Sequence, residues 1–337
     1  MSASPNHKSQ PVPQITLAVL DKVHHLPAVG SWPASPHRFD SPSVWALNAA
    51  LATRRPLLVR GEPGTGKSQL ARAAAHVLQW PFLSRVVNAR FEPEDLLFRF
   101  DAVARLAMAQ IMPKADVDAA LKHLEPRKFL LPEILWWAID YESARDQFAQ
   151  ASRQCGETTC NYGENTGFPK TAESGVVVLI DEIDKADTEV PNSLLEALAN
   201  NGFQAPFGGG PIRLGQGHPP LVVITTNEER ELPAAFLRRC LVLQMDLPDD
   251  VKELRQRLFE RARAHYSTEA IHDDVCHAAI TQLLKDRHEL KQRELPFPGQ
   301  AELLDLLEAL SRMCEGRDAQ IAALENIRSF ALSKNRI

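Results

Sequence analysis

The sequence predicts an α/β protein in which a five-stranded parallel sheet is flanked by helices and followed by a small all-α lid domain. Two observations carry this prediction. Short apolar runs, some rich in β-branched residues, alternate with stretches that favour helices, a pattern typical of strands buried on both faces of a parallel sheet. After Pro248 only helical patterns remain. The five expected strands are 56–60, 82–87, 176–180, 221–225 and 241–245.

The strongest single motif is the octet Gly-Glu-Pro-Gly-Thr-Gly-Lys-Ser at residues 61–68. Its spacing is that of a phosphate-binding loop, and it lies between an expected strand and an expected helix, as such a loop must. Glycines let successive N–H groups turn toward an anion, while Lys67 is expected to reach the β- and γ-phosphates and Ser68 to bind Mg²⁺. A glycine-rich surface turn is the alternative. The expected nucleotide-binding residues are Gly61, Glu62, Pro63, Gly64, Thr65, Gly66, Lys67, Ser68 and Gln69.

Two carboxylates, Asp181 and Glu182, directly follow the most apolar run, at 176–180. Ligands of parallel α/β sheets lie beyond the carboxyl ends of the strands, so both carboxylates are expected near the phosphates. Asp181 is predicted to bind Mg²⁺ together with Ser68, usually through water. Glu182 is predicted to be catalytic, polarising the water that attacks the γ-phosphate. The alternative is a surface acidic pair at the end of a strand.

Three further residues are candidates for catalysis. Asn227 follows the expected strand 221–225, where its side chain could hold the attacking water; a turn-forming asparagine is the alternative. Arg238 and Arg239 end a short predicted helix just before the strand 241–245. An arginine can stabilise the charge on a transferring phosphoryl group. Spacing alone does not say whether these arginines act on their own subunit or on a neighbour.

Taken together, the order of these motifs resembles that of the AAA+ ATPases and, within them, the bacterial MoxR-like branch. The resemblance runs from about residue 40 to the C-terminus. Its phosphate loop and acidic motif are shared by the whole family, whereas the stretch Asp95-Leu96-Leu97-Phe98-Arg99-Phe100-Asp101 points to this branch. The segments that carry the resemblance are 61–68, 95–101, 178–187, 225–227 and 236–239.

This resemblance implies that the cofactors are ATP and Mg²⁺, held between the subunits of a ring that is commonly a hexamer. It also implies that Asn227 is the sensor on the fourth strand. One arginine of the pair, Arg239 rather than Arg238, would reach into the neighbouring subunit's site. Asn88, at the end of the second expected strand, matches a position at which many such proteins restrain the catalytic glutamate.

The chain departs from the family pattern in the lid. AAA+ proteins often carry a second sensor arginine at the start of a lid helix, where this chain has Gln300. A glutamine cannot supply a fixed positive charge. Coupling between nucleotide and lid is therefore expected to be weaker or to use another lid arginine. Arg261 and Arg263 are candidates, although such residues are more often solvated charges on a helix face.

The same patterns predict the domain organisation. A proline-rich segment, 1–40, is expected to be a flexible N-terminal extension. Residues 41–247 are predicted to form the α/β nucleotide-binding domain, and 248–337 the helical lid. An insertion at 110–174 and a glycine-punctuated hairpin at 203–220 interrupt the α/β domain. The residues that precede the insertion have the apolar spacing of a helix over 94–109.

The insertion contains two pairs of residues with open interpretations. Trp136 and Trp137 either face the channel of a ring, where they could grip a polypeptide, or anchor the insertion onto the domain, which is favoured. Cys155 and Cys160 suggest a metal or redox pair, but no second pair lies elsewhere in the sequence, so no zinc site is expected. The five cysteines are odd in number and scattered, which excludes a disulfide framework.

Charge and hydropathy narrow the choice of partner and compartment. The net charge of -5 argues against a nucleic-acid partner. So does the hairpin segment at 203–220, which contains Arg213 but no other arginine or lysine. No apolar run approaches the length of a membrane span, and the start lacks a basic-then-apolar signal segment. We therefore expect a cytoplasmic protein without a membrane partner.

The leading functional hypothesis is a ring-forming, MoxR-like ATPase that hydrolyses ATP to remodel or activate a protein partner. By family analogy that partner is a protein with a von Willebrand A domain. Two alternatives stay open: an ATP-dependent assembly switch or scaffold with little turnover, and a chelatase-type or nucleic-acid-translocating motor. The intact Glu182 and Arg239 argue against a protein that only binds ATP.

Overall fold

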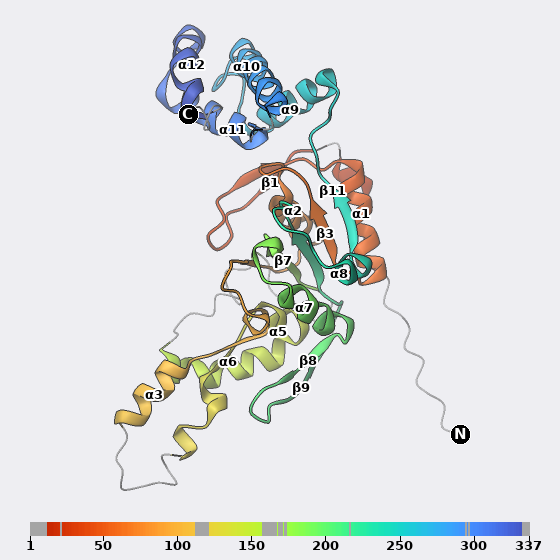
Figure 1. Cartoon of the computed structure of the whole chain (residues 1–337), viewed down its shortest axis with the longest axis vertical. Coiled ribbons are helices and arrows are strands. Elements are labelled where there is room, and N and C mark those ends of the chain that lie inside the picture. Colours follow the sequence, from red (N-terminus) through yellow and green to blue (C-terminus); the bar gives the residue numbers. More distant parts are fainter. Residues whose placement is uncertain are drawn as a thin grey trace, which may run out of the picture.

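The computed structural model shows three regions that follow one another along the long axis of the molecule. The helical lid lies at one end, the parallel sheet in the middle, and the insertion and the separate hairpin toward the other end (Figure 1). The residues that the structure describes are 12–20, 22–111, 121–156, 167, 171, 174–215, 217–293, 295 and 297–331.

The predicted five-stranded parallel sheet is confirmed. Its strands follow the order β11-β3-β10-β7-β4, and each hydrogen-bonded pair is parallel. Because neighbouring strands are not consecutive in sequence, helical crossovers join them and cover both faces of the sheet. The strands are β3 (Leu57–Arg60), β4 (Phe82–Val86), β7 (Val177–Asp181), β10 (Leu221–Thr225) and β11 (Leu241–Gln244).

Alternate side chains of the sheet pack into two separate hydrophobic clusters. On β3, Leu57 and Val59 join one cluster and Leu58 joins the other, as the two-residue period of a strand requires. The first cluster is completed by helices α1 (Ser41–Thr53) and α2 (Lys67–Leu78). The second is completed by α5 (Ile134–Ile139), α7 (Glu189–Ala199) and α8 (Ala234–Arg239).

Part of the segment predicted to be a flexible extension, 1–40, is instead built into the domain. Strands β1 (His24–Leu26) and β2 (Ser35–His37) form an antiparallel pair after a short 3-10 helix at Leu17–Val19. The guanidinium of Arg72 on α2 donates to the carbonyl oxygens of Pro27 at 2.7 Å and Pro33 at 2.9 Å. Composition suggested flexibility, but buried apolar side chains and this buried arginine hold the segment on α2.

The residues that precede the insertion differ from their sequence-based prediction. The helix expected over 94–109 is divided into a 3-10 turn (Pro93–Leu96), strand β5 (Phe98–Phe100) and helix α3 (Ala102–Ile111). Strand β5 pairs antiparallel with β6 (Leu130–Pro132), because Phe98 and Phe100 pack against the main core. A long amphipathic helix, α6 (Tyr141–Cys155), follows α5 and packs on β6.

The two tryptophans of the insertion are anchors. Trp136 and Trp137 lie on α5 and are 1% and 2% exposed within the core beneath the sheet. The indole N–H of Trp136 donates to the Ser143 hydroxyl at 3.1 Å, and that of Trp137 donates to the Pro132 carbonyl oxygen at 3.2 Å. In this position neither indole can grip a polypeptide in a channel, so the anchoring interpretation is the one that the structure supports.

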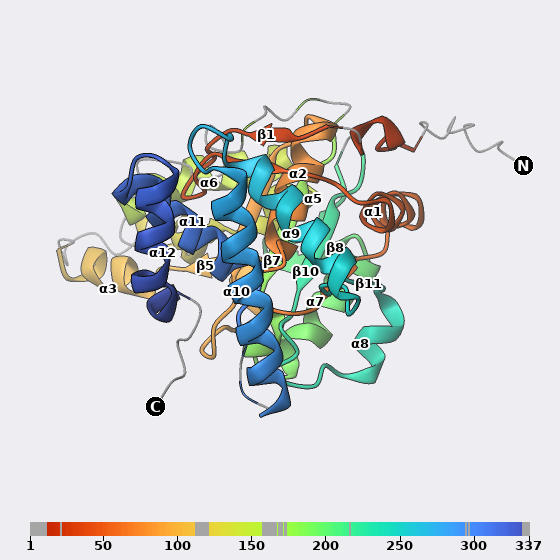
Figure 2. The same cartoon turned by 90° about the horizontal axis from the view of Figure 1, so that it is seen from above.

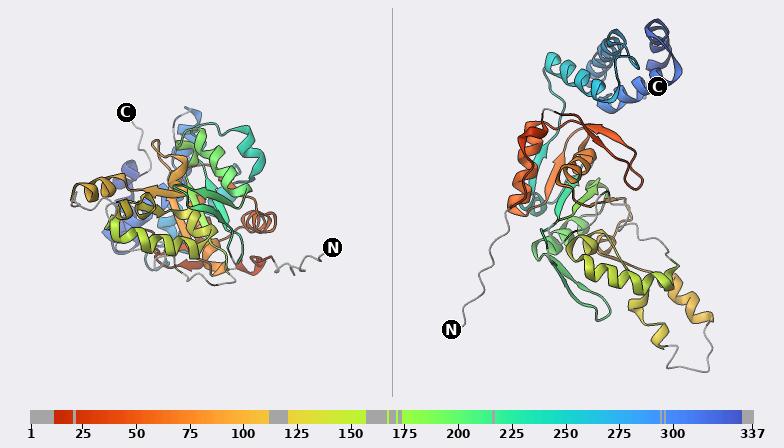
Figure 3. Two further views of the ribbon diagram at one scale, coloured as in Figure 1. Left: turned by 90° about the horizontal axis from the view of Figure 1, so that it is seen from below. Right: turned by 180° about the vertical axis from the view of Figure 1, so that it is seen from behind.

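The hairpin expected within 203–220 is formed by β8 (Gly202–Ala205) and β9 (Gly210–Arg213), which pair antiparallel. It lies at the end of the molecule opposite the lid, as the rear view shows (Figure 3). Phe207, at the turn, is half exposed and its ring lies 4.9 Å from that of Phe100.

In the part of the lid that the structure describes, four helices pack around a hydrophobic cluster of their own. They stand together when the molecule is seen from the lid side (Figure 2). Among the described residues, no helix combines the length and apolar composition that a membrane span requires. The lid helices are α9 (Val251–His265), α10 (Asp273–Gln292), α11 (Gln300–Met313) and α12 (Arg317–Ala331).

Candidate nucleotide-binding site

The phosphate loop leaves β3 and opens α2, as its motif predicts. Gly61, Gly64 and Gly66 have φ values of 135°, 75° and 96°, a region in which side chains with a Cβ are strained. Space is also restricted, because a Cβ on Gly61 would lie 2.6 Å from the Met245 carbonyl oxygen. The loop geometry therefore requires glycine at these positions.

Lys67 lies at the start of α2 and is 6% exposed. Its ammonium donates to the carbonyl oxygens of Gly61 at 2.8 Å and Glu62 at 2.9 Å. Burial lowers the pKa of Lys67, while the charges of Asp181 and Asp184 act in the opposite sense. The charge of Lys67 is held by neutral carbonyl groups, so it is available to an anion in the loop.

The predicted magnesium ligands lie together. The Ser68 hydroxyl donates to Asp181 Oδ1 at 2.7 Å, and the Thr225 hydroxyl at the end of β10 donates to the same oxygen. Thr225 also accepts a hydrogen bond from the backbone N–H of Glu182 at 2.9 Å, which ties β7 to β10 at this edge. Hard oxygen donors fit Mg²⁺, which commonly uses one or two protein ligands with waters and phosphates. Thr225 was missed by the sequence analysis, although its place at a strand end was visible.

Glu182 occupies an unusual backbone conformation, with φ 61° and ψ 48°. Its carboxylate accepts from the ammonium of Lys185 at 2.6 Å and from the side-chain amide of Asn227 at 3.4 Å. Strained backbone of this kind is concentrated at functional sites. Asn88, expected to restrain this glutamate, is exposed, and its side chain instead accepts from the Arg90 backbone N–H at 2.8 Å.

These groups surround one cavity of about 360 Å³ at the carboxyl edge of the sheet. Besides Asp181, Glu182 and Asn227, six of the nine predicted nucleotide-binding residues line it; Gly61, Glu62 and Thr65 do not. Thr65 instead donates through its hydroxyl to the Glu62 carbonyl oxygen at 3.0 Å. The six that line the cavity are Pro63, Gly64, Gly66, Lys67, Ser68 and Gln69.

Two segments remote in sequence close this cavity. The N-terminal one was expected to be a flexible extension, whereas Arg261 of the lid was a candidate for coupling to the nucleotide. The N-terminal strand pair contributes Trp32 and His37, and the lid contributes Arg261, His265 and Gln300. Burial, assisted by the nearby positive charge of Arg261, lowers the pKa of His37 to about 3. The imidazole of His37 is therefore neutral at physiological pH. The base or sugar of a bound nucleotide would thus meet the aromatic rings of Trp32 and His37 and the polar side chains of the lid.

The lid also makes a direct ionic contact with the phosphate loop. Arg287 of α10 donates through one nitrogen to both carboxylate oxygens of Glu62, at 2.7 and 2.8 Å. Gln300, at the second-sensor position, is 7% exposed and begins α11. A Cβ on Gly64 would lie 2.6 Å from the Ala301 Cβ, so the lid and the loop are closely apposed. Arg287 thus makes the contact with the loop, while Arg261, one of the two candidate arginines, lines the cavity.

The predicted finger arginines lie elsewhere. Arg238 and Arg239 end α8, and neither is among the described residues that line the cavity. The guanidinium of Arg55 donates to three successive carbonyl oxygens there, those of Arg238 at 2.5 Å, Arg239 at 3.0 Å and Cys240 at 3.0 Å. The C-terminal end of α8 is therefore fixed, while the cavity of the same chain does not include its arginines.

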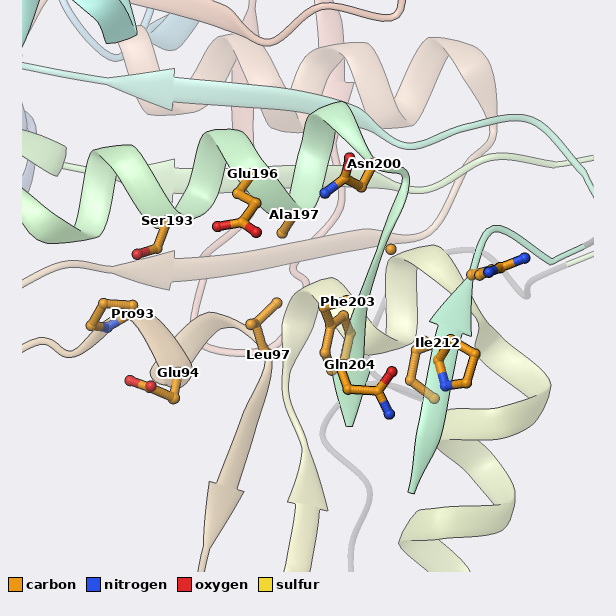
Figure 4. Close-up of a pocket in the computed structure, with 13 residues that line it drawn as sticks. Pro93, Glu94, Leu97, Ser193, Glu196, Ala197, Asn200, Phe203, Gln204 and Ile212 are labelled. Atoms are coloured by element: carbon orange, nitrogen blue, oxygen red, sulfur yellow. The ribbon is translucent and has the colours of Figure 1, made fainter. Parts of the chain in front are cut away.

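A larger cavity, of about 690 Å³, lies away from this edge. Figure 4 shows the 3-10 turn residues Pro93 and Glu94 on one side and Glu196 of α7 on the other, with the hairpin residue Phe203 beside them. No residue of the phosphate loop lines it. Its size alone does not make it the candidate nucleotide site, because the residues predicted to bind phosphate line the smaller cavity.

The described residues hold no group of three or more His, Cys, Asp or Glu side chains that could bind a metal ion by themselves. Of the suggested cysteine pair, Cys155 ends α6, whereas Cys160 lies outside the described residues. A magnesium ion would therefore depend on nucleotide oxygens in addition to Ser68 and Asp181.

A comparison with curated proteins found no match for the chain. Two solved structures similar to it are point mutants of RuvB from Thermotoga maritima: one is 18% identical, covers 85% of this chain and 68% of that chain, and has a TM-score of 0.41. The other is 17% identical, covers 85% and 67%, and has a TM-score of 0.40. The family described as AAA domain (dynein-related subfamily) matches residues 56–262, more than half of the sequence. The chain therefore belongs to the AAA domain family, in its dynein-related subfamily.

Proposed function

We propose that this chain is an ATPase of the MoxR-like AAA+ branch that hydrolyses ATP between the subunits of a ring, commonly a hexamer, to remodel or activate a protein partner. One observation carries the proposal. Lys67, Asp181, Glu182 and Asn227 line one cavity, whereas Arg239 lies outside it. The cavity includes the lid residue Arg261 but not the predicted finger arginine, so the site is suited to completion by a neighbouring copy.

Each group has a distinct role in this proposal. Lys67 binds the β- and γ-phosphates, and Ser68 and Asp181 hold Mg²⁺, which when bound neutralises charge on the phosphate oxygens. Glu182 polarises the attacking water, and Asn227, 3.4 Å from its carboxylate, positions that water. Arg239 of the adjacent subunit, with Arg238 as the second choice, stabilises the charge that develops on the transferred group.

The nature of the partner rests on the branch resemblance. The stretch 95–101 that points to the MoxR-like branch forms part of the 3-10 turn and β5, beside the hairpin and the larger cavity. We propose a protein client, for which a von Willebrand A domain protein is the candidate, in the cytoplasm. Among the described residues that line the larger cavity, Arg213 is the one basic side chain, which does not favour a nucleic-acid client.

An ATP-dependent switch with little turnover is a second candidate, and one observation favours it. The ion pair between Lys185 and Glu182, at 2.6 Å, occupies one oxygen of the carboxylate that must polarise water. If that pair persists with nucleotide bound, hydrolysis would be slow. A Lys185→Ala variant distinguishes the two functions, because it should raise the turnover of a switch and leave that of a motor nearly unchanged.

The test of the proposed function is a Glu182→Gln variant. We expect it to keep ATP binding and to lose turnover by about 10²–10⁴-fold, the usual contribution of general base catalysis. ATP hydrolysis, binding of a fluorescent ATP analogue and ring assembly by light scattering would be measured together. Glu189→Gln, an exposed glutamate on α7, is the matched control. Equal turnover in Glu182→Gln and the unaltered protein would refute the role of Glu182.

A further inference from the structure

One ion pair, between Arg287 and Glu62, joins the lid directly to the phosphate loop. Arg287 lies on the lid helix α10, and its side chain is 9% exposed, while that of Glu62 is 27% exposed. The Arg287 guanidinium also lies over the ring of Phe297, 4.4 Å from its centroid, and donates to the Pro298 carbonyl oxygen at 3.3 Å. Its orientation is therefore fixed by three separate contacts.

Burial makes the two partners dependent on each other. An arginine held this far from water requires a compensating charge, and removing Glu62 alone would leave Arg287 buried and unpaired. Glu62 carries its carboxylate within the loop that is expected to bind a triphosphate, where an uncompensated negative charge would repel the ligand. Arg287 supplies that compensation from a different domain of the fold.

The pair is also connected to the phosphate-binding lysine. The carbonyl oxygen of Glu62 accepts from the Lys67 ammonium at 2.9 Å and from the Thr65 hydroxyl at 3.0 Å. A shift of Glu62 would therefore displace the group on which Lys67 rests. Arg287 thus acts on the loop through Glu62, without lining the cavity itself.

We propose that Arg287 is a positioning residue that holds the lid on the phosphate loop and that, by cancelling the charge of Glu62, it raises the affinity of the loop for nucleotide. The proposal rests on the function proposed above, because it requires the loop to bind a nucleoside triphosphate. It gives the lid a fixed positive charge that acts on the loop, whereas Gln300 at the second-sensor position is uncharged.

The test compares three variants of the full-length chain: Arg287→Gln, Glu62→Gln and the double variant. Arg287→Gln should weaken binding of a fluorescent ATP analogue by about tenfold or more, since truncating one member of a buried charge pair is costly. Glu62→Gln removes the repelling carboxylate, so the double variant should bind the analogue within about threefold of the unaltered protein. Hydrogen exchange should rise at residues 61–64 and 299–304 in all three, because each lacks the ion pair.

Two further variants keep the result interpretable. Arg312→Gln, at an exposed arginine on α11, should match the unaltered protein in both measurements. If Arg287→Gln does not fold, Arg287→Lys keeps the charge but loses the planar contact with Phe297, and it should show a smaller loss of affinity. Unchanged affinity in Arg287→Gln, or a double variant as weak as the single one, would overturn the proposal. If the unaltered protein binds no nucleotide, the proposed function itself fails.

Discussion

The predicted catalytic residues lie in two regions, the carboxyl edge of the sheet and the C-terminal end of α8, and only the first region surrounds the cavity. At the sheet edge, side chains from three separate motifs, among them Ser68, Asp181 and Asn227, are connected by hydrogen bonds around one cavity. At the end of α8, Arg55 fixes three backbone carbonyl groups, and Arg238 and Arg239 lie outside that cavity. We infer from this difference that the sheet edge forms a site within one chain, and that the end of α8 contributes its arginines to the site of a second copy.

The largest expected effect tests this division directly. Arg239→Ala should lower the turnover of ATP by about 10³–10⁵-fold, because an arginine finger has that effect on phosphoryl transfer. Mixing it with Lys67→Ala protein, which should lack nucleotide binding, should restore part of the activity, since each variant supplies what the other lacks at hybrid interfaces. Steady-state hydrolysis is measured over a range of mixing ratios. No recovery, despite demonstrated mixed assembly, would show that the arginine does not act between subunits.

A smaller effect is expected at Arg55, which sharpens the comparison. Arg55→Ala should reduce turnover by about 100-fold, because a displacement of about 1 Å in a group that contacts the reacting atoms has that consequence. The variant should regain activity when mixed with Lys67→Ala but not when mixed with Arg239→Ala. Its exposed neighbour Arg54 provides the control variant, Arg54→Ala. Recovery of activity on mixing with Arg239→Ala would show that Arg55 does not act by positioning Arg239.

The smallest effect concerns the N-terminal strand pair that closes the cavity. Burial lowers the pKa of His37 to about 3 in the folded chain, below the ordinary value of 6.5, so protonation favours the unfolded state. Its contribution to stability is complete above pH 6.5 and is lost as the pH falls from 6.5 toward 3. Between about pH 7 and about pH 5.5, the unaltered protein should lose about 1 kcal/mol more stability than a His37→Gln variant. Urea unfolding at both pH values measures this difference, and parallel losses would contradict it.

Much of the fold and of the candidate nucleotide site could be predicted because their signals are local. An unbroken apolar run predicts a buried strand, and the glycine spacing of 61–68 specifies the backbone of the loop regardless of what surrounds it. The same holds for Asp181 and Glu182, which follow the strand β7 directly. The helix expected over 94–109 was wrong. Phe98 and Phe100 pack against the apolar core, and their segment pairs with β6 as a strand instead of continuing a helix.

The sequence by itself determined the sheet, the phosphate loop and the order of the catalytic motifs, because each is encoded within a few consecutive residues. Tertiary structure alone decided the partners that arrive from a distance: the N-terminal strands on α2, Arg287 on Glu62, and Arg55 beneath the end of α8. The physical reason is that an arginine or histidine gives no local indication of its partner. A charge or donor becomes specific only when folding removes it from water and leaves one group within reach.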